Sequence, residues 1–184
     1  VTFNKNTATK AGGAAFNNAN GILVFSGENN FSENTAAQNG GAIYNQGTIY
    51  FTGDTTTFSG NTANNVSNAL YNSGTVNFVN GTNTFNDAIN GSATNGTLNI
   101  QNENTVLALN NTVSDNDINL SNGLLKLGHT GDAVGSLAGD VNFNVTGGAL
   151  SLEDNATNSH NLGKVVLDEN LGVSLDTDLA ATAS

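Results

Sequence analysis

The chain has 184 residues, the size of one domain, and its net charge of −11 arises from 15 acidic residues and four lysines. Without arginine and with so few lysines, it has almost nothing to neutralise phosphates, which excludes nucleic-acid binding and attachment to anionic membranes through a basic patch. The absence of cysteine excludes disulfides, thiolate catalysis and Cys-ligated metal sites.

Phenylalanines recur along the first half of the chain at a nearly constant spacing. Phe3, Phe31, Phe58 and Phe85 are 28, 27 and 27 residues apart. The first three open an F-x-x-N-T-A phrase, whose asparagines are Asn6, Asn34 and Asn61, and the phrase after Phe85 is a degenerate copy. A fixed period of this length is typical of stacked repeats, in which each unit buries its apolar positions against its neighbours.

Two further phrases follow each phrase that begins with phenylalanine. The first is glycine-rich: Gly40-Gly41-Ala42-Ile43 has a near copy at residues 12–15 and a divergent copy at 67–70. The second is a run of alternating apolar residues after a glycine, at 21–25, 47–51, 74–78 and 96–100. Alternation predicts short strands, and the frequent Gly and Asn residues oppose helices.

Many short strands fit either an antiparallel sandwich or a parallel β-helix. Hairpin folds give no reason for a residue to resemble another one 27 positions later, whereas a coil stacks each residue on its counterpart. The sequence therefore predicts an all-β fold, a right-handed parallel β-helix with about three strands per coil and roughly seven coils.

The stacking predicts where particular side chains lie. Phe31, Phe58 and Phe85 are expected to stack along one interior line, because a polar interior would leave amides unsatisfied. Asparagines, roughly a fifth of the residues, are expected to form ladders between coils. Asn34 and Asn61 are expected at turns, with left-handed backbone, and Gly40-Gly41 at a tight corner.

The repeat becomes less regular from about Ile100 onwards. Leucine replaces phenylalanine, and a single late glycine phrase appears at residues 147–150. We expect one solenoid over residues 1–184, with regular repeats in 1–100 and less regular coils in 101–184; a separate C-terminal subdomain is the alternative. Since the chain begins inside a repeat and ends without an evident cap, we expect it to be a fragment of a longer protein, with any targeting signal outside it.

The F-x-x-N and G-G-A-[ILV] phrases resemble the repeats of chlamydial polymorphic outer membrane proteins and related autotransporter passengers. The resemblance covers roughly residues 1 to 90, on Phe3 to Asn6, Phe31 to Asn34, Phe58 to Asn61 and Gly40 to Ile43. It implies a β-helical passenger secreted through an outer-membrane barrel and displayed as an adhesin at the bacterial surface. The chlamydial proteins usually carry cysteines, and this chain has none.

Some parallel β-helices are polysaccharide lyases or hydrolases, so acidic pairs were considered as catalytic candidates. These pairs are Asp115 with Asp117, Glu153 with Asp154, Asp168 with Glu169, and Asp176 with Asp178. We expect them in solvated turns and edges, and we expect His129 and His160 in surface loops. No catalytic residue, metal ligand or cofactor is predicted. Ice-binding solenoids carry regular T-x-T rows on every coil, and ice binding is disfavoured here because we expect the threonines, such as Thr55-Thr56-Thr57, not to keep register.

The predicted function is therefore structural and adhesive: a passenger segment at the cell surface that binds a host protein or glycan, or associates with itself. A carbohydrate-active enzyme domain, a lyase or a hydrolase, is the alternative. A cluster of carboxylates on one face would favour the enzyme.

Overall fold

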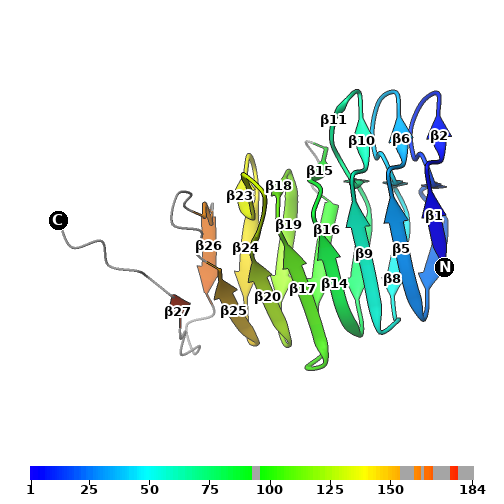
Figure 1. The fold of residues 1–184 in the computed structure, drawn as a ribbon. Coiled ribbons are helices and arrows are strands. Elements are labelled where there is room, and N and C mark those ends of the chain that lie inside the picture. Colours follow the sequence, from blue (N-terminus) through cyan, green and yellow to red (C-terminus); the bar gives the residue numbers. More distant parts are fainter. Residues whose placement is uncertain (93–95, 154–159, 163, 168–174, 178–184) are drawn as a thin grey trace.

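The computed structural model describes residues 1–92, 96–153, 160–162, 164–167 and 175–177. Within this part of the chain there are strands and turns but no helix, and the strands stack into a parallel β-solenoid. Figure 1 shows the coils side by side, with the N-terminal coil at one end. The predicted all-β, parallel β-helical class is thus confirmed. Six consecutive turns each place one strand in each of three main sheets.

Three parallel sheets form the sides of the solenoid. Sheet I contains β1 (Thr2–Asn4), β5 (Glu28–Ser32), β9 (Thr55–Ser59), β14 (Gly81–Phe85), β17 (Thr105–Leu109), β20 (Leu124–Leu127), β25 (Ala149–Leu152) and β27 (Leu175–Thr177). Sheet II contains β3 (Ala15–Asn17), β7 (Ile43–Asn45), β12 (Leu70–Asn72), β15 (Ile89–Gly91), β18 (Thr112–Ser114) and β23 (Ser136–Ala138). Sheet III contains β4 (Ile22–Phe25), β8 (Thr48–Phe51), β13 (Thr75–Phe78), β16 (Gly96–Ile100), β19 (Asn116–Leu120), β24 (Asn142–Val145) and β26 (Lys164–Leu167).

The first three coils carry an additional short sheet, sheet IV. It contains β2 (Thr7–Ala8), β6 (Thr35–Ala36), β10 (Thr62–Ala63) and the antiparallel strand β11 (Val66–Ser67). In Figure 1 these strands lie in loops that extend beyond the rest of the coils. A small hairpin of β21 (His129–Thr130) and β22 (Ala133–Val134) interrupts the sixth coil.

The core is a set of columns in which each side chain rests on its counterpart one coil away. In sheet I, Phe3, Phe31, Phe58 and Phe85 pair in register, and the column continues through Leu109, Leu127 and Leu152. The ring centroids of Phe31 and Phe58 are 4.5 Å apart, those of Phe58 and Phe85 are 4.3 Å apart, and the stacked rings are nearly parallel. The expected aromatic stack is confirmed, and Phe31, Phe58 and Phe85 are almost fully buried.

The two residues of the repeated glycine pair must each be glycine, for different structural reasons. Gly40 adopts a φ of +63°, which a residue with a Cβ reaches only at a cost. Gly41 has ordinary φ but no room: a Cβ there would lie 2.5 Å from the Asn68 carbonyl oxygen and 2.5 Å from the Thr62 nitrogen. The Gly40-Gly41 corner is therefore required both by backbone conformation and by the neighbouring coil.

Sheets I and III continue without a break across residue 100, where the sequence repeat becomes less regular. β16 pairs in parallel with β19, and β17 with β20, in the same registers that relate the earlier coils. The change of coil type begins earlier than expected, at the fourth coil, because the chain passes from Phe85 to Ile89 without a sheet IV strand.

Candidate functional site: an exposed polar face and the amide ladders beneath it

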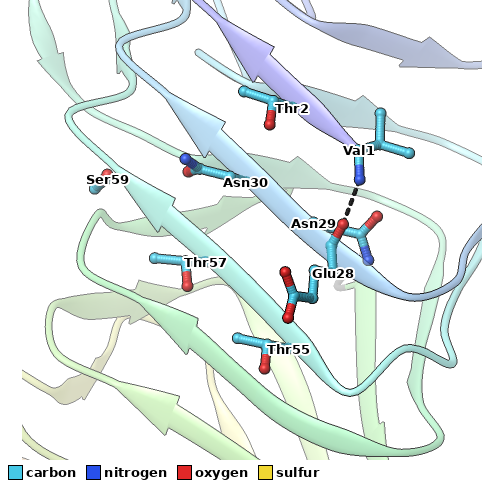
Figure 2. Close-up of a pocket in the computed structure, with 8 residues that line it drawn as sticks. All are labelled: Val1, Thr2, Glu28, Asn29, Asn30, Thr55, Thr57 and Ser59. Atoms are coloured by element: carbon cyan, nitrogen blue, oxygen red, sulfur yellow. Dashed lines mark hydrogen bonds between the residues drawn. The ribbon is translucent and has the colours of Figure 1, made fainter.

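A shallow depression lies on the outer face of sheet I, across the first three coils. It is lined by Val1, Thr2, Glu28, Asn29, Asn30, Thr55, Thr57 and Ser59 (Figure 2). Strand alternation explains most of the lining, since Phe31 and Phe58 point inward and their neighbours along β5 and β9 point outward; Asn29 is buried beneath it. Thr2, Asn30 and Thr57 are in direct register, so hydroxyl and amide groups form a row along the solenoid. This surface offers hydrogen-bonding groups and one charged side chain, Glu28.

The outward threonines of sheet I keep register where we expected none. Thr55 and Thr57 of β9 pair with Thr82 and Thr84 of β14, which makes a T-x-T array on two consecutive coils. The expectation that such threonines are out of register is wrong for these strands. The array ends on both sides, at Glu28 and Asn30 in one direction and at residues 106 and 108 in the other. We call the outward residues Thr2, Glu28, Asn30, Thr55, Thr57, Thr82 and Thr84 the hydroxyl face.

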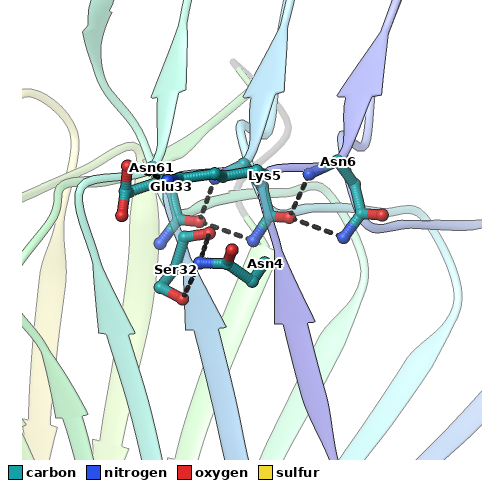
Figure 3. A network of polar contacts seen from close by, with 7 residues as sticks. Asn4, Lys5, Asn6, Ser32, Glu33 and Asn61 are labelled. Atoms are coloured by element: carbon teal, nitrogen blue, oxygen red, sulfur yellow. Dashed lines mark hydrogen bonds and ion pairs between the residues drawn. The ribbon is translucent and has the colours of Figure 1, made fainter.

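At the corner between the sheet I strands and sheet IV, the asparagines of the F-x-x-N phrase form a hydrogen-bonded ladder (Figure 3). Asn6 donates from its backbone N and from Nδ2 to Asn34 Oδ1, at 3.0 and 2.8 Å. Asn34 donates in the same way to Asn61 Oδ1, at 3.1 and 2.9 Å. Each of the first two coils therefore binds the next through a pair of hydrogen bonds at this corner.

This ladder corrects two expectations. Asn34 and Asn61 are not the left-handed residues of the turn; that conformation belongs to the preceding residues, Glu33 (φ 54°) and Gly60 (φ 69°). Both asparagines are fully buried, so the interior is not purely apolar. Their amides are satisfied because the next coil supplies a hydrogen-bond acceptor for each of them. The expectation of an apolar interior considered one coil alone and so overlooked these acceptors.

The ladder ends in a carboxylate that sequence reasoning missed. Asp87 Oδ2 accepts hydrogen bonds from the Asn61 backbone N and Nδ2, at 2.9 and 2.8 Å, and Oδ1 accepts one from Gly60 N at 2.9 Å. Burial raises the pKa of Asp87, and these hydrogen bonds oppose the rise only in part. Asp87 comes two residues after Phe85 instead of three, so the degenerate phrase still provides an acceptor.

A second ladder joins sheet II to the following turn. Asn17 Nδ2 donates to Asn45 Oδ1, and Asn45 Nδ2 donates to Asn72 Oδ1, both at 2.8 Å. Asn72 Nδ2 then reaches Asn116 Oδ1, 2.9 Å away and 44 residues later in the sequence. This hydrogen bond passes the fourth coil, where Gly91 and Gly96 leave room for the two asparagine side chains. A Cβ on either glycine would lie within 2.7 Å of an amide nitrogen of the ladder.

A third ladder lies on the outer face of sheet III and runs from the third coil to the sixth. Asn99 donates to Asn77, Asn119 to Asn99, and Asn144 to Asn119, at 3.0, 2.8 and 2.9 Å. Its direction is opposite to that of the two interior ladders. The predicted asparagine ladders are thus confirmed, and they account for many of the residues that make the composition unusual.

An exposed aromatic stack marks the outer face of sheet II. Phe16, Tyr44 and Tyr71 lie in register, with ring centroids 5.0 and 5.2 Å apart and nearly parallel planes. Their faces cover one another, and Phe16 is 56% exposed. Partial burial raises the pKa of Tyr71, and Tyr44 and Asp115 add smaller electrostatic contributions.

The carboxylate pair that the enzyme alternative requires is engaged in the scaffold. Asp115 Oδ1 accepts a hydrogen bond from Asp140 N at 3.3 Å. Asp117 Oδ1 accepts from Asn142 N and Nδ2, at 3.2 and 2.9 Å. Both carboxylates therefore bind the next coil. Glu153 forms an ion pair with Lys126 at 2.5 Å.

Several other candidates fall outside the described residues or remain isolated. Asp154, Asp168, Glu169 and Asp178 lie outside the described part, as does the side chain of Asp176. His129 is exposed in β21, and the ring nitrogens of His160 contact the carbonyl oxygens of Gly135 and Glu153. Among the residues described, no three His, Asp or Glu side chains gather in a way that could hold a metal ion.

Comparisons with protein-family models, curated proteins and solved structures find no match for this chain. In the described part of the chain, no helix is long and apolar enough to span a membrane.

Proposed function

We propose that this chain is a structural and adhesive segment of a secreted bacterial surface protein, an autotransporter-like passenger at the outer membrane surface. The observation that carries the proposal is the hydroxyl face, supported by an interior in which every described coil is bonded to the next. Ladders of amides and stacked rings oppose sliding and bending between coils, so the face keeps its shape. The F-x-x-N repeats, which resemble those of chlamydial surface proteins, support the same conclusion.

The partner we propose is a host-surface glycan or protein, or a second copy of the chain, contacted through the hydroxyl face. Threonine hydroxyls and Asn30 provide both donors and acceptors. The low count of cationic side chains argues against nucleic acid as a partner. No catalytic role is proposed, because the carboxylates Asp115 and Asp117 serve as acceptors for the sixth coil.

The test compares two threonines with similar surroundings on different faces. Thr57 lies on the hydroxyl face and Thr75 on the outer face of sheet III, and both are half-buried in the third coil. We expect Thr57→Arg to abolish binding to immobilised host glycans, matrix proteins or another copy of the chain, and Thr75→Arg to retain it. Circular dichroism would verify that both variants fold. Equal binding by the two variants would contradict the assignment of the face.

The enzyme alternative has its own experiment. The parent and the double variant Asp115→Asn/Asp117→Asn would be incubated with a panel of polysaccharides, and reducing ends would be measured. We expect no cleavage by either protein. Cleavage by the parent that the double variant lacks would replace the adhesive proposal with the enzymatic one.

A further inference from the structure

Asparagine followed by glycine is a chemically labile step. Without a Cβ, glycine allows its own backbone nitrogen to approach the preceding carboxamide, and asparagine is among the thermolabile residues of proteins. The sequence has such steps at Asn20-Gly21, Asn39-Gly40, Asn80-Gly81, Asn90-Gly91, Asn95-Gly96 and Asn122-Gly123. Asn95 lies outside the described residues.

The structure distinguishes Asn122 from the other described steps. Asn122 is exposed in the turn between β19 and β20. The backbone nitrogen of Gly123 lies 2.9 Å from Asn122 Oδ1, beside the carbonyl carbon of the same carboxamide. This nitrogen donates to the side chain that it would attack and not to a neighbouring coil. The nucleophile and the reacting carbon are therefore already adjacent.

At the other steps, the glycine nitrogen or the asparagine is engaged elsewhere. Gly21 N donates to Asn18 O at 2.9 Å, and Gly81 N donates to Asn104 O at 3.1 Å. Asn90 Oδ1 accepts a hydrogen bond from Ser114 Oγ, and Gly91 pairs within sheet II. Gly40 is buried in the corner described above. These steps provide internal controls with the same dipeptide chemistry.

We propose that Asn122 is a site of spontaneous covalent modification, at which the chain converts to isoaspartate and aspartate. The Gly123 nitrogen, after losing its proton to solvent base, forms a bond with Asn122 Cγ. The bond from Cγ to Nδ2 breaks, and ammonia leaves with a proton from solvent. Water then opens the resulting five-membered imide at either carbonyl. Neither an oxidant nor a reductant is involved.

The modification changes a closely packed turn. In the isoaspartate product the main chain runs through Cγ, which adds one methylene to the backbone. The next coil leaves little space for it, since a Cβ on Gly148 would lie 3.0 Å from the Asn122 carbonyl carbon and 2.8 Å from Gly123 O. The product also carries a new carboxylate on an already acidic chain. Modified molecules are therefore expected to unfold at a lower temperature.

The experiment incubates the full folded chain at mildly alkaline pH. Mass spectrometry of proteolytic fragments would follow each Asn-Gly step, and methylation by a protein isoaspartyl methyltransferase would count isoaspartate independently. We expect Asn122 to convert several-fold faster than Asn20 and Asn80, and we expect the difference to disappear in denaturant. Asn122→Gln should remove the part of the early methylation signal that mass spectrometry assigns to residue 122, without loss of fold, because Asn122 is exposed.

Two results would overturn the proposal. One is conversion of Asn20 or Asn80 at least as fast as that of Asn122 in the folded chain. The other is an unchanged methylation signal in Asn122→Gln. Asn122→Asp, which adds the charge without the methylene, separates the two consequences: it should melt closer to the parent than the isoaspartate-containing fraction does.

Discussion

The first three coils and the coils that follow them solve the same packing problem with different residues. In the early coils the interior of sheet I holds phenylalanine beside Asn29 and Thr56, and Phe85 and Asn83 extend both columns into the fourth coil. From the fifth coil onwards both columns hold leucine, and Leu107, Leu125 and Leu150 replace the polar residues. The solenoid therefore depends on the register of inward positions, and repetition of the sequence is one of several ways to maintain that register.

The amide ladders also differ between the two regions: they are mainly interior in the early coils and lie mainly on the outer surface in the later coils. Early coils bury them at the corners, where each donor meets an acceptor in the next coil. Later coils carry an asparagine ladder on the outer face of sheet III, where water competes for the same groups. The early coils thus have polar, directional bonds in their interior, and the later coils depend more on apolar packing.

Removing an interior ring should produce the largest effect. Phe58 is fully buried between Phe31 and Phe85, so Phe58→Ala should reduce the free energy of unfolding by about 3–5 kcal/mol. Phe16→Ala removes a ring that is 56% exposed and should cost less than about 1 kcal/mol. Chemical denaturation of both variants measures the difference. Similar losses of unfolding free energy in the two variants would contradict the expected difference between the buried stack of sheet I and the exposed stack of sheet II.

Breaking an interior ladder should cost more than breaking the outer one. Asn61→Ala leaves Asn34 without its acceptor and Asp87 without its side-chain donor, so we expect a loss of about 1–3 kcal/mol. Asn119→Ala breaks the outer ladder at its centre and should cost about 1 kcal/mol or less. An Asn119 variant less stable than the Asn61 variant would reverse the proposed contrast between the regions.

The glycine corner of the early coils should respond to packing as well as to backbone strain. Gly41→Ala places a Cβ against two backbone atoms of the third coil and should cost about 1–3 kcal/mol. Gly27→Ala, at a φ of +68° with nothing within 4 Å of its Cβ, should cost about 1–2 kcal/mol from conformation alone. Thermal unfolding should rank Gly41→Ala as the less stable variant. The opposite ranking would mean that the neighbouring coil moves away.

The smallest expected effect is the pH dependence contributed by Asp87. Its pKa in the folded chain is raised, mainly by burial, so the folded state binds this proton more tightly than the unfolded state does. The contribution of Asp87 to stability is therefore full below the unfolded pKa and decreases as pH rises through the folded pKa. Asp87→Asn removes the titratable group and with it this pH-dependent contribution to stability. The stability of the parent relative to Asp87→Asn should fall as pH rises from acid towards neutrality, and a rise would contradict the direction of the shift.

The period of the phenylalanines was enough to predict the all-β class, the parallel coils and the stacked rings. It could not place Asn34 and Asn61 correctly, because the preference of asparagine for turns is a local property and its partner belongs to another coil. Asp87 was missed because it lies two residues after Phe85, whereas the asparagines lie three residues after their phenylalanines. An alignment of the repeats therefore does not match Asp87 with Asn34 and Asn61. The hydroxyl face emerged only when register aligned Thr55 and Thr57 with Thr82 and Thr84.

Hydrogen exchange of backbone amides in the full chain tests the central claim most directly, namely that both regions form one continuous series of coils. The amides that join β9 to β14 lie before the change in sequence near residue 100, and those that join β17 to β20 lie after it. We predict that both sets are protected and that they lose protection together as denaturant is added. Protection that ends near residue 100, with rapid exchange in β19 and β20, would contradict the account.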